Sequence, residues 1–153
     1  PEKPFLETTD ADWHRVLDVD LNAVFYGCRA ALPGMVSNNW GRIINLTGMN
    51  AIHGYSGRAP VSVAKHGVWG LTKALAKEFG PSGITVNAIS PGPIRPEHDD
   101  PIQSQHLHGQ VGRIPLGHLG EPYHIASLCA YLISDGGGFV SGQMIACNGA
   151  AET

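Results

Sequence analysis

The sequence predicts an α/β protein in which helices pack on a parallel β-sheet. Apolar residues spaced three and four apart, as in an amphipathic helix, recur in three separate segments. Short runs rich in β-branched residues, such as RIINLT at 42–47, follow these segments and are typical of buried strands. Helices and strands therefore alternate along the chain. Parallel strands joined by right-handed crossovers produce this alternation.

The first helix is expected over residues 13–35, with a capping box in front of it. Thr9 has the properties of an N-cap, and Asp12 stands three residues later. Pro33 and Gly34 are expected to kink or fray the end of this helix, because proline has no N–H to donate and clashes with the preceding turn.

The alternation continues through the rest of the chain. A strand is predicted at 42–47, and Pro60 suits the first turn of a second helix that ends at Phe79. A second strand is predicted at 84–89. After a long loop, Glu121 opens a third helix, which three glycines end before a last short strand. Three strands are few for a doubly wound sheet.

Composition and charge exclude several classes of function. The 153 residues suffice for one domain with its own core, so 1–153 is treated as a single domain. The formal net charge is −3, so the sequence does not predict the positively charged surface that nucleic-acid-binding proteins use. No apolar run of about 18 residues is present, so no membrane span is expected. The three cysteines are widely separated and odd in number, which indicates reduced thiols in a cytoplasmic protein.

Six short segments carry a family resemblance. They are WHRVLDVDL (13–21), GRIIN (41–45), AKHGV (64–68), ITVNAISPG (84–92), IPLG (114–117) and SGQ (141–143). Together, and in this order, they resemble the second half of the classical short-chain dehydrogenase/reductase family. The resemblance implies a partial Rossmann fold, in which the N-terminal βαβ unit that holds the cofactor pyrophosphate has no counterpart. It also implies descent from an NAD(P)-linked oxidoreductase.

The family's catalytic residues carry over position by position. In the family a Tyr is the general acid and base, a Lys four residues later lowers its pKa and holds the ribose, a Ser steadies the substrate oxygen, and an Asn completes a proton relay. Here Lys65 is present, but Val61 stands at the Tyr position, Gly48 at the Ser position and Asp20 at the Asn position. Thr47, beside Gly48, is expected to point to the other side of the strand.

The resemblance also implies a weakened cofactor site. Lys65, Pro91, Gly92 and Ile94 match family positions around the cofactor. The family's Thr that binds the nicotinamide amide falls on Pro96, which has no side-chain donor. NAD(P) is therefore implied by the resemblance alone, and we expect that it does not bind tightly.

Two residues near Lys65 offer other chemistry. Tyr55 is the only nearby tyrosine, and it stands ten residues before Lys65, so that only a rebuilt loop would bring it to the catalytic position. Ser62 and Lys65 form an S-x-x-K pattern on one helix face, in which the lysine serves as base for a serine nucleophile. Some hydrolases use this arrangement. A serine at this place is also common in the resembled family, where it is not a nucleophile.

Histidines and aspartates between residues 98 and 108 do not indicate a metal site. The residues concerned are His98, Asp99, Asp100, His106 and His108. No helical i, i+4 pair of ligands is present among them, so a solvated polar loop is expected and no metal is assigned.

Three functions remain open at this point. The first is a folded family member without hydride transfer. The second is a repurposed, esterase-like hydrolase that uses Ser62 and Lys65. The third is a fragment of a longer active oxidoreductase, whose other half lies elsewhere. A small-molecule ligand is compatible with each of them.

We also expect a homo-oligomer. Without the family's N-terminal half, the strand at 42–47 presents an unpaired edge, and such edges recruit other chains. The helices at 13–35 and 60–79 carry apolar residues over a wide arc, as Phe25 and Trp69 illustrate. A helix that is apolar over much of its circumference needs a second partner, which a two-fold-related subunit would supply.

Overall fold

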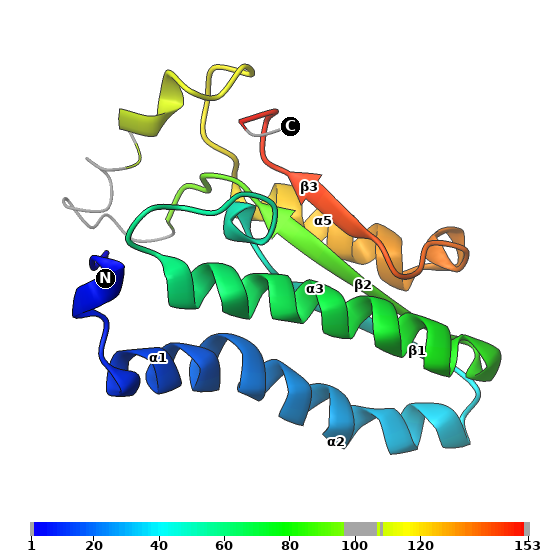
Figure 1. The fold of residues 1–153 in the computed structure, drawn as a ribbon. Coiled ribbons are helices and arrows are strands. Elements are labelled where there is room, and N and C mark those ends of the chain that lie inside the picture. The colour runs from blue at the N-terminus through cyan, green and yellow to red at the C-terminus, as the bar shows by residue number, and fades with distance from the viewer. Residues whose placement is uncertain (1, 97–106, 108, 152–153) are drawn as a thin grey trace.

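Helices and strands alternate as the sequence predicts. The structure, a computed structural model, describes residues 2–96, 107 and 109–151. In chain order the elements are α1 (Asp10–Leu17), α2 (Ala23–Ser37), β1 (Gly41–Leu46), α3 (Ala59–Phe79), β2 (Ile84–Pro91), α5 (Pro122–Ile133) and β3 (Met144–Cys147). The predicted α/β class and partial Rossmann architecture are confirmed (Figure 1).

The sheet is parallel, with the strand order β1-β2-β3. β1 pairs with β2 from Gly41 opposite Ile84 to Leu46 opposite Ile89. β3 pairs with the second half of β2. β2 is thus the central strand, and its burial on both faces explains the unbroken apolar character of the ITVNAI segment. Within the described residues β1 has a partner on one edge only.

Helices cover both faces of the sheet (Figure 1). α2 and α3 lie on one face and α5 lies on the other. A buried cluster joins the first pair of helices to the sheet, and it consists of Cys28, Leu32, Ile43, Ile84 and Val86. Each large apolar side chain buried in this way contributes about 1.5–3 kcal/mol. Burial also raises the pKa of the Cys28 thiol. No helix in the described part of the chain has the length and apolar character to cross a bilayer.

The first predicted helix is interrupted by a wider turn. Residues Asp18–Asn22 form a π-helical turn between α1 and α2, where a continuous helix was expected. Such turns insert one residue into the hydrogen-bond ladder and are frequent at functional sites. α2 continues past Pro33 and Gly34 to Ser37, two residues beyond the expected end at Met35. Proline removes only one backbone hydrogen bond, and α2 retains the rest of its ladder and its packing on the core.

The capping box in front of α1 is confirmed, and it is joined to the N-terminal segment. The Asp12 N–H donates to Thr9 Oγ1 over 3.1 Å, and the Thr9 N–H donates to Asp12 Oδ2 over 3.2 Å. Lys3 donates to the same carboxylate over 2.6 Å. This hydrogen bond, together with those from Thr9, holds the pKa of the Asp12 carboxyl below its usual range. Lys3 also donates its backbone N–H to the Gly57 carbonyl over 2.9 Å, which ties the N-terminal segment to the loop before α3.

Candidate functional site

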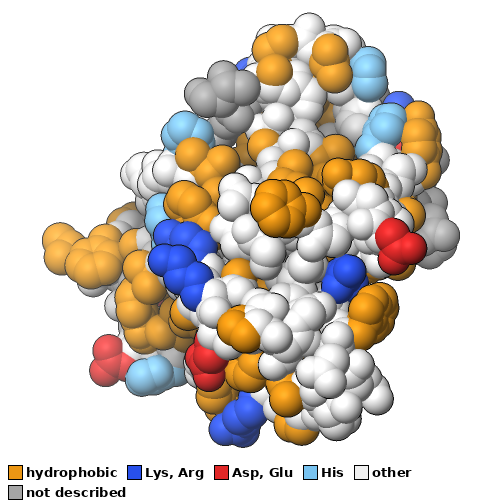
Figure 2. Space-filling view, turned by 90° about the vertical axis from the view of Figure 1, so that its right-hand side faces the viewer, with side chains coloured by type: hydrophobic (Ala, Val, Ile, Leu, Met, Phe, Trp, Pro, Cys, Tyr) orange, Lys and Arg blue, Asp and Glu red, His pale blue; other side chains and the backbone are white. Residues whose placement is uncertain are grey.

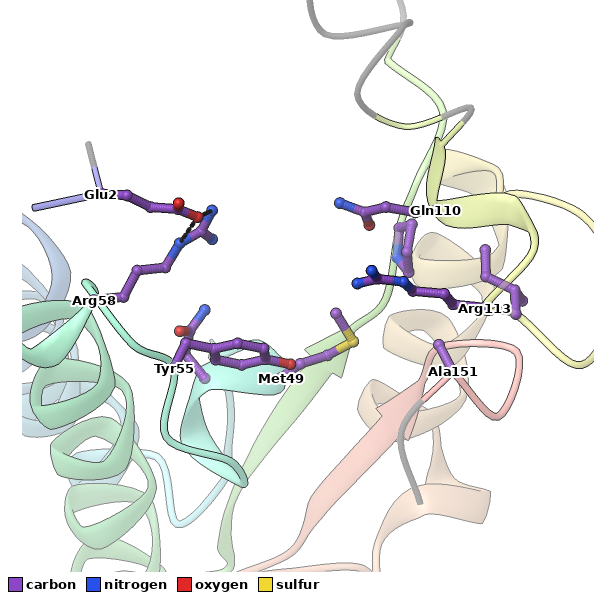
Figure 3. A pocket seen from close by; sticks show the side chains of 10 residues that line it. Glu2, Met49, Tyr55, Arg58, Gln110, Arg113 and Ala151 are labelled. Carbon is purple, nitrogen blue, oxygen red and sulfur yellow. Dashed lines mark hydrogen bonds and ion pairs between the residues drawn. The ribbon is translucent and has the colours of Figure 1, made fainter.

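The loops that leave the carboxyl ends of β1 and β2 surround a cavity of about 220 Å³. This edge of an open parallel sheet is where such folds bind ligands. The cavity is lined by Glu2, Met49, Asn50, Tyr55, Arg58, Pro93, Gln110, Arg113, Ile114 and Ala151. Figure 3 shows Tyr55 and Met49 on one side of the space, with Gln110 and Arg113 on the other.

Lys65 and Asp20 are brought together by α3 and the π-helical turn. Lys65 Nζ lies 3.0 Å from Asp20 Oδ1, and the two side chains are 20% and 30% exposed. An asparagine at position 20 would offer an NH₂ donor and a carbonyl acceptor, whereas an ionised aspartate only accepts. The ammonium of Lys65 is therefore paired with a carboxylate at the position where the family has an amide.

Val61 stands one helical turn before Lys65 on α3. It lines a small cavity of about 40 Å³ against the N-terminal segment, together with Lys3, Gly57 and Pro60. An isopropyl group has neither a proton to give nor a lone pair to accept one. Tyr55 does not replace it there, because Tyr55 lines the larger cavity, which Lys65 does not line.

The position that corresponds to the family's serine has a backbone that suits glycine. Gly48 has φ 145° and ψ 172°, a region that is essentially restricted to glycine. The neighbouring Thr47 is 8% exposed. Its hydroxyl donates to the Ile89 carbonyl over 3.0 Å, so that it links β1 to β2 and does not face the cavity. Neither residue presents a hydroxyl to a substrate oxygen.

Ser62 and Lys65 share α3 but do not form a nucleophile–base pair in the structure. The Oγ of Ser62 is buried and has no hydrogen-bond partner within the part of the chain that is described. Lys65 is instead paired with Asp20. Neither Ser62 nor Lys65 lines the 220 Å³ cavity.

Three residues at and after the end of β2 were matched to the cofactor site, and they also have structural roles. A Cβ on Gly92 would lie 2.5 Å from the Cα of Asn148, so only glycine allows this close approach of two backbones. Ile94 forms an isolated bridge with Gly120 and lines a second cavity, of about 420 Å³. Pro91 ends β2.

The histidines and aspartates considered as metal ligands lie outside the described residues. They are His98, Asp99, Asp100, His106 and His108. Within the residues that are described, no group of three or more His, Cys, Asp or Glu side chains is arranged to hold a metal ion.

Comparison with known proteins identifies the family. A family model described as Enoyl-(Acyl carrier protein) reductase matches residues 1–150. Acetoacetyl-CoA reductase of Cupriavidus necator is 39% identical over 145 residues, which are 95% of this chain and 59% of the relative. The chain belongs to the short-chain dehydrogenase/reductase family. A second short-chain dehydrogenase/reductase relative, the 3-oxoacyl-[acyl-carrier-protein] reductase FabG of Rickettsia felis, is 39% identical over 140 residues.

Solved structures agree with this assignment. A putative oxidoreductase from Escherichia coli K-12 superposes with a TM-score of 0.86 at 32% identity, over 99% of this chain and 59% of that one. The chain thus spans about three fifths of the length of the short-chain dehydrogenase/reductase proteins that it matches.

Several residues of the cavity were not predicted from the sequence. Arg113 lies in a turn and precedes one of the family segments, and Glu2 and Arg58 belong to irregular segments that are 56 residues apart. Hydrophobic periodicity does not report the position of residues in irregular segments. The order of the family motifs places the loops after β1 and β2 at one edge of the sheet. That order is the one sequence feature that would have indicated that these residues line the same cavity.

We predict that restoring the family's serine at position 48 destabilises the protein. Gly48→Ser forces a side chain into a glycine-only conformation, and the free energy of unfolding should fall by about 1–3 kcal/mol. Gly54→Ser is the matched control in the same loop, where φ is not positive and a Cβ meets no atom within 4 Å. It should change the free energy of unfolding by less than about 0.5 kcal/mol. Urea titration measures both, and equal stability of the two variants would contradict the prediction.

Proposed function

We propose that this chain is a short-chain dehydrogenase/reductase that does not carry out effective hydride transfer. The observation that supports the proposal is Val61, one turn before a Lys65 that is bound by Asp20. Hydride addition to a carbonyl requires a proton for the oxygen as negative charge develops there. Loss of a positioned general acid costs roughly 10²–10⁴-fold in rate. The glycine at position 48 removes a hydrogen bond to the same oxygen.

A longer polypeptide would not by itself restore the reaction. The relatives extend beyond this chain by about two fifths of their length. If such a segment or another chain supplied the phosphate-binding βαβ unit, it would bring a cofactor to a site in which Val61 still has no proton to give. The reading as a fragment of an active oxidoreductase therefore requires a proton donor from outside these residues.

The residues present fit the nicotinamide cofactor poorly. NAD(P), as the family resemblance implies, would supply the hydride when bound. Lys65 is the residue that would hold the ribose, but its ammonium is already paired with Asp20 over 3.0 Å. Pro96 offers no donor at the position of the nicotinamide amide.

We expect weak cofactor binding for this reason. Titration of the protein with NADH and with NADPH, followed by nicotinamide fluorescence, should give dissociation constants above about 100 μM. Val61→Tyr serves as a comparison, since it restores the general acid without adding a phosphate site, and it should leave this constant unchanged. Tight binding of either cofactor to the unmodified chain would contradict this expectation of weak binding.

An esterase-like activity of Ser62 and Lys65 is the alternative function. The burial of Ser62 Oγ and the Lys65–Asp20 ion pair both count against it. If the protein hydrolyses simple esters by this route, Ser62→Ala and Lys65→Ala should each abolish the activity, and the double variant should be no worse. Thr72→Ser, on the same helix and fully buried, is the control. Hydrolysis that survives Ser62→Ala at its full rate would exclude this mechanism.

The cytoplasm is the proposed location. The support is that Cys28, Cys129 and Cys147 are all free thiols, as is usual in a reducing compartment.

We further propose that the protein forms homo-oligomers. A groove of about 360 Å³ runs along the open edge of β1 and is lined by residues of β1 and α2, among them Met35 and Ile44. Phe25 and Tyr26 on α2 are 41% and 54% exposed. Figure 2 shows further apolar side chains spread over the right-hand face of the molecule. Large exposed apolar surface of this kind marks interaction sites.

Sedimentation at low micromolar concentration tests the oligomer. We expect a species of at least twice the chain mass of 16.2 kDa. Tyr26→Glu should shift the distribution toward monomer, because it places a charge in the apolar surface, and Tyr123→Glu on α5 is the control for the opposite face of the sheet. A single monomeric species, with unfolding that is independent of protein concentration, would show the proposal to be wrong.

A further inference from the structure

A second cavity, of about 420 Å³, lies between the carboxyl end of β3, the first turns of α5 and the loop before α5. Its volume is within the roughly 300–1,000 Å³ of pockets that hold small molecules. No described residue of its lining is an aspartate, glutamate, lysine or arginine. Among the described residues it shares only Pro93 with the cavity in Figure 3, and neither Lys65 nor Gly92 lines it.

The walls of this second cavity are held together by backbone contacts. The Gly120 N–H donates to the Pro93 carbonyl over 2.9 Å, and the Arg95 N–H donates to the Gly120 carbonyl over 2.8 Å. Ile94 forms a bridge with Gly120 between these two bonds. The Arg95 side chain donates from Nε to Glu121 Oε1 over 2.7 Å, so the charges beside the lining neutralise each other. The cavity is therefore preformed, and it offers a ligand neither a carboxylate nor a cationic side chain.

Two histidines of the lining are held in opposite tautomers. His124 Nδ1 lies 2.9 Å from the Glu121 N–H, which can only donate, so this nitrogen carries no proton and the neutral ring has its N–H at Nε2. His118 Nδ1 lies 2.9 Å from the Leu119 carbonyl oxygen, which can only accept. This nitrogen therefore carries the proton, and the neutral His118 ring has its lone pair at Nε2. Within the described part of the chain, neither Nε2 has a partner.

This pair of tautomers does not suit a metal ion. A metal would need a lone pair on Nε2 of both rings, and His124 has its proton there. Its Nδ1 is already used in capping α5. The two rings instead present one N–H donor and one acceptor to the same cavity. They complement an organic molecule that accepts a hydrogen bond from His124 and donates one to His118.

We propose that this second cavity binds a neutral cyclic amide or imide. A ring carbonyl accepts from His124 Nε2, a ring N–H donates to His118 Nε2, and the ring contacts Ile94 and Leu116. An amide carries its donor and its acceptor on separate atoms of one rigid plane, so both bonds form with little loss of conformational freedom. A charged ligand would lose its hydration without gaining a partner of opposite charge. The proposal goes beyond the family's reaction and requires neither cofactor nor hydride transfer.

Calorimetric titration at about pH 8, where imidazole side chains are generally neutral, tests the proposal. The probe is uracil, and we expect a dissociation constant below about 1 mM. The comparison ligands are 1,3-dimethyluracil, which has no N–H, and orotate, which adds a carboxylate. Each should bind at least about fivefold more weakly than uracil, a difference of about 1 kcal/mol. Absence of uracil binding at about 10 mM, or equal affinity for the three ligands, would overturn the proposal.

NADH separates this cavity from a nicotinamide site. An NADH concentration of about 1 mM should leave the dissociation constant for uracil unchanged, because Lys65 and Gly92 do not line the cavity. Displacement of uracil by NADH would assign the cavity to the cofactor and refute the proposal. Tight NADH binding that does not displace uracil would contradict only the weak cofactor binding expected above, so the two proposals fail independently.

Variants of His118 test the acceptor. His118 is exposed, so His118→Phe should fold, and it should weaken uracil binding at least about fivefold because the acceptor is lost. The affinity for 1,3-dimethyluracil, which has no N–H to donate, should not change. His66→Phe is the matched control, because His66 Nδ1 also lies beside a backbone carbonyl, 2.8 Å from that of Ser62, and the ring is exposed on α3. Equal weakening of uracil binding by the two variants would overturn the assignment.

The cysteines locate the ligand without any substitution. Cys147 lines the second cavity, and Cys129, which is also a partly buried free thiol, does not. Saturating uracil should slow the alkylation of Cys147 by iodoacetamide at least about threefold and leave that of Cys129 unchanged, because the bound ring restricts access to the first thiol alone. Peptide mass spectrometry measures both rates. Equal protection of the two cysteines, or protection of neither, would place the ligand elsewhere.

Discussion

Strand β2 is hydrogen-bonded along both edges, and its first seven residues are all buried. Backbone groups in such a position must be paired, so β2 requires both β1 and β3. The buried Asn87 adds two side-chain bonds, because its amide donates to the Val140 carbonyl over 2.7 Å and accepts from the Gln143 N–H over 3.1 Å. These contacts fix where the loops leave the carboxyl ends of the strands, and the cavity is built from those loops.

The residues that replace the family's catalytic residues are compatible with one another in charge and in backbone conformation. Asp20 and Lys65 satisfy each other's charge, and Gly48 uses a backbone conformation that glycine tolerates. Val61 lines a small cavity beside the N-terminal segment. A site that had merely lost single groups would leave their former partners buried and unpaired, at a cost in stability. Ser62 Oγ is a local exception, since it is buried without a partner.

The sequence predicts the strands, the long helix α3 and the capping box, because hydrophobic spacing and cap residues report burial and chain ends directly. The π-helical turn could not be predicted, since residues 18–22 contain no glycine or proline and the flanking spacing continues as in an ordinary helix. The Asp20–Lys65 ion pair joins residues that are 45 positions apart, and it was not predicted. The family resemblance placed each of the two residues at a catalytic position but did not indicate their pairing. The place of Arg113 depends on the packing of a turn, which no local pattern encodes.

Glu2 and Ala151 both line the cavity, so the first and last described residues meet at one site. Two segments from opposite ends of the described chain thus form parts of the same lining. Local fraying of the segment around Glu2 would open one wall of the cavity. The shape of the cavity therefore depends on the bonds that Lys3 makes to Asp12 and to the Gly57 carbonyl.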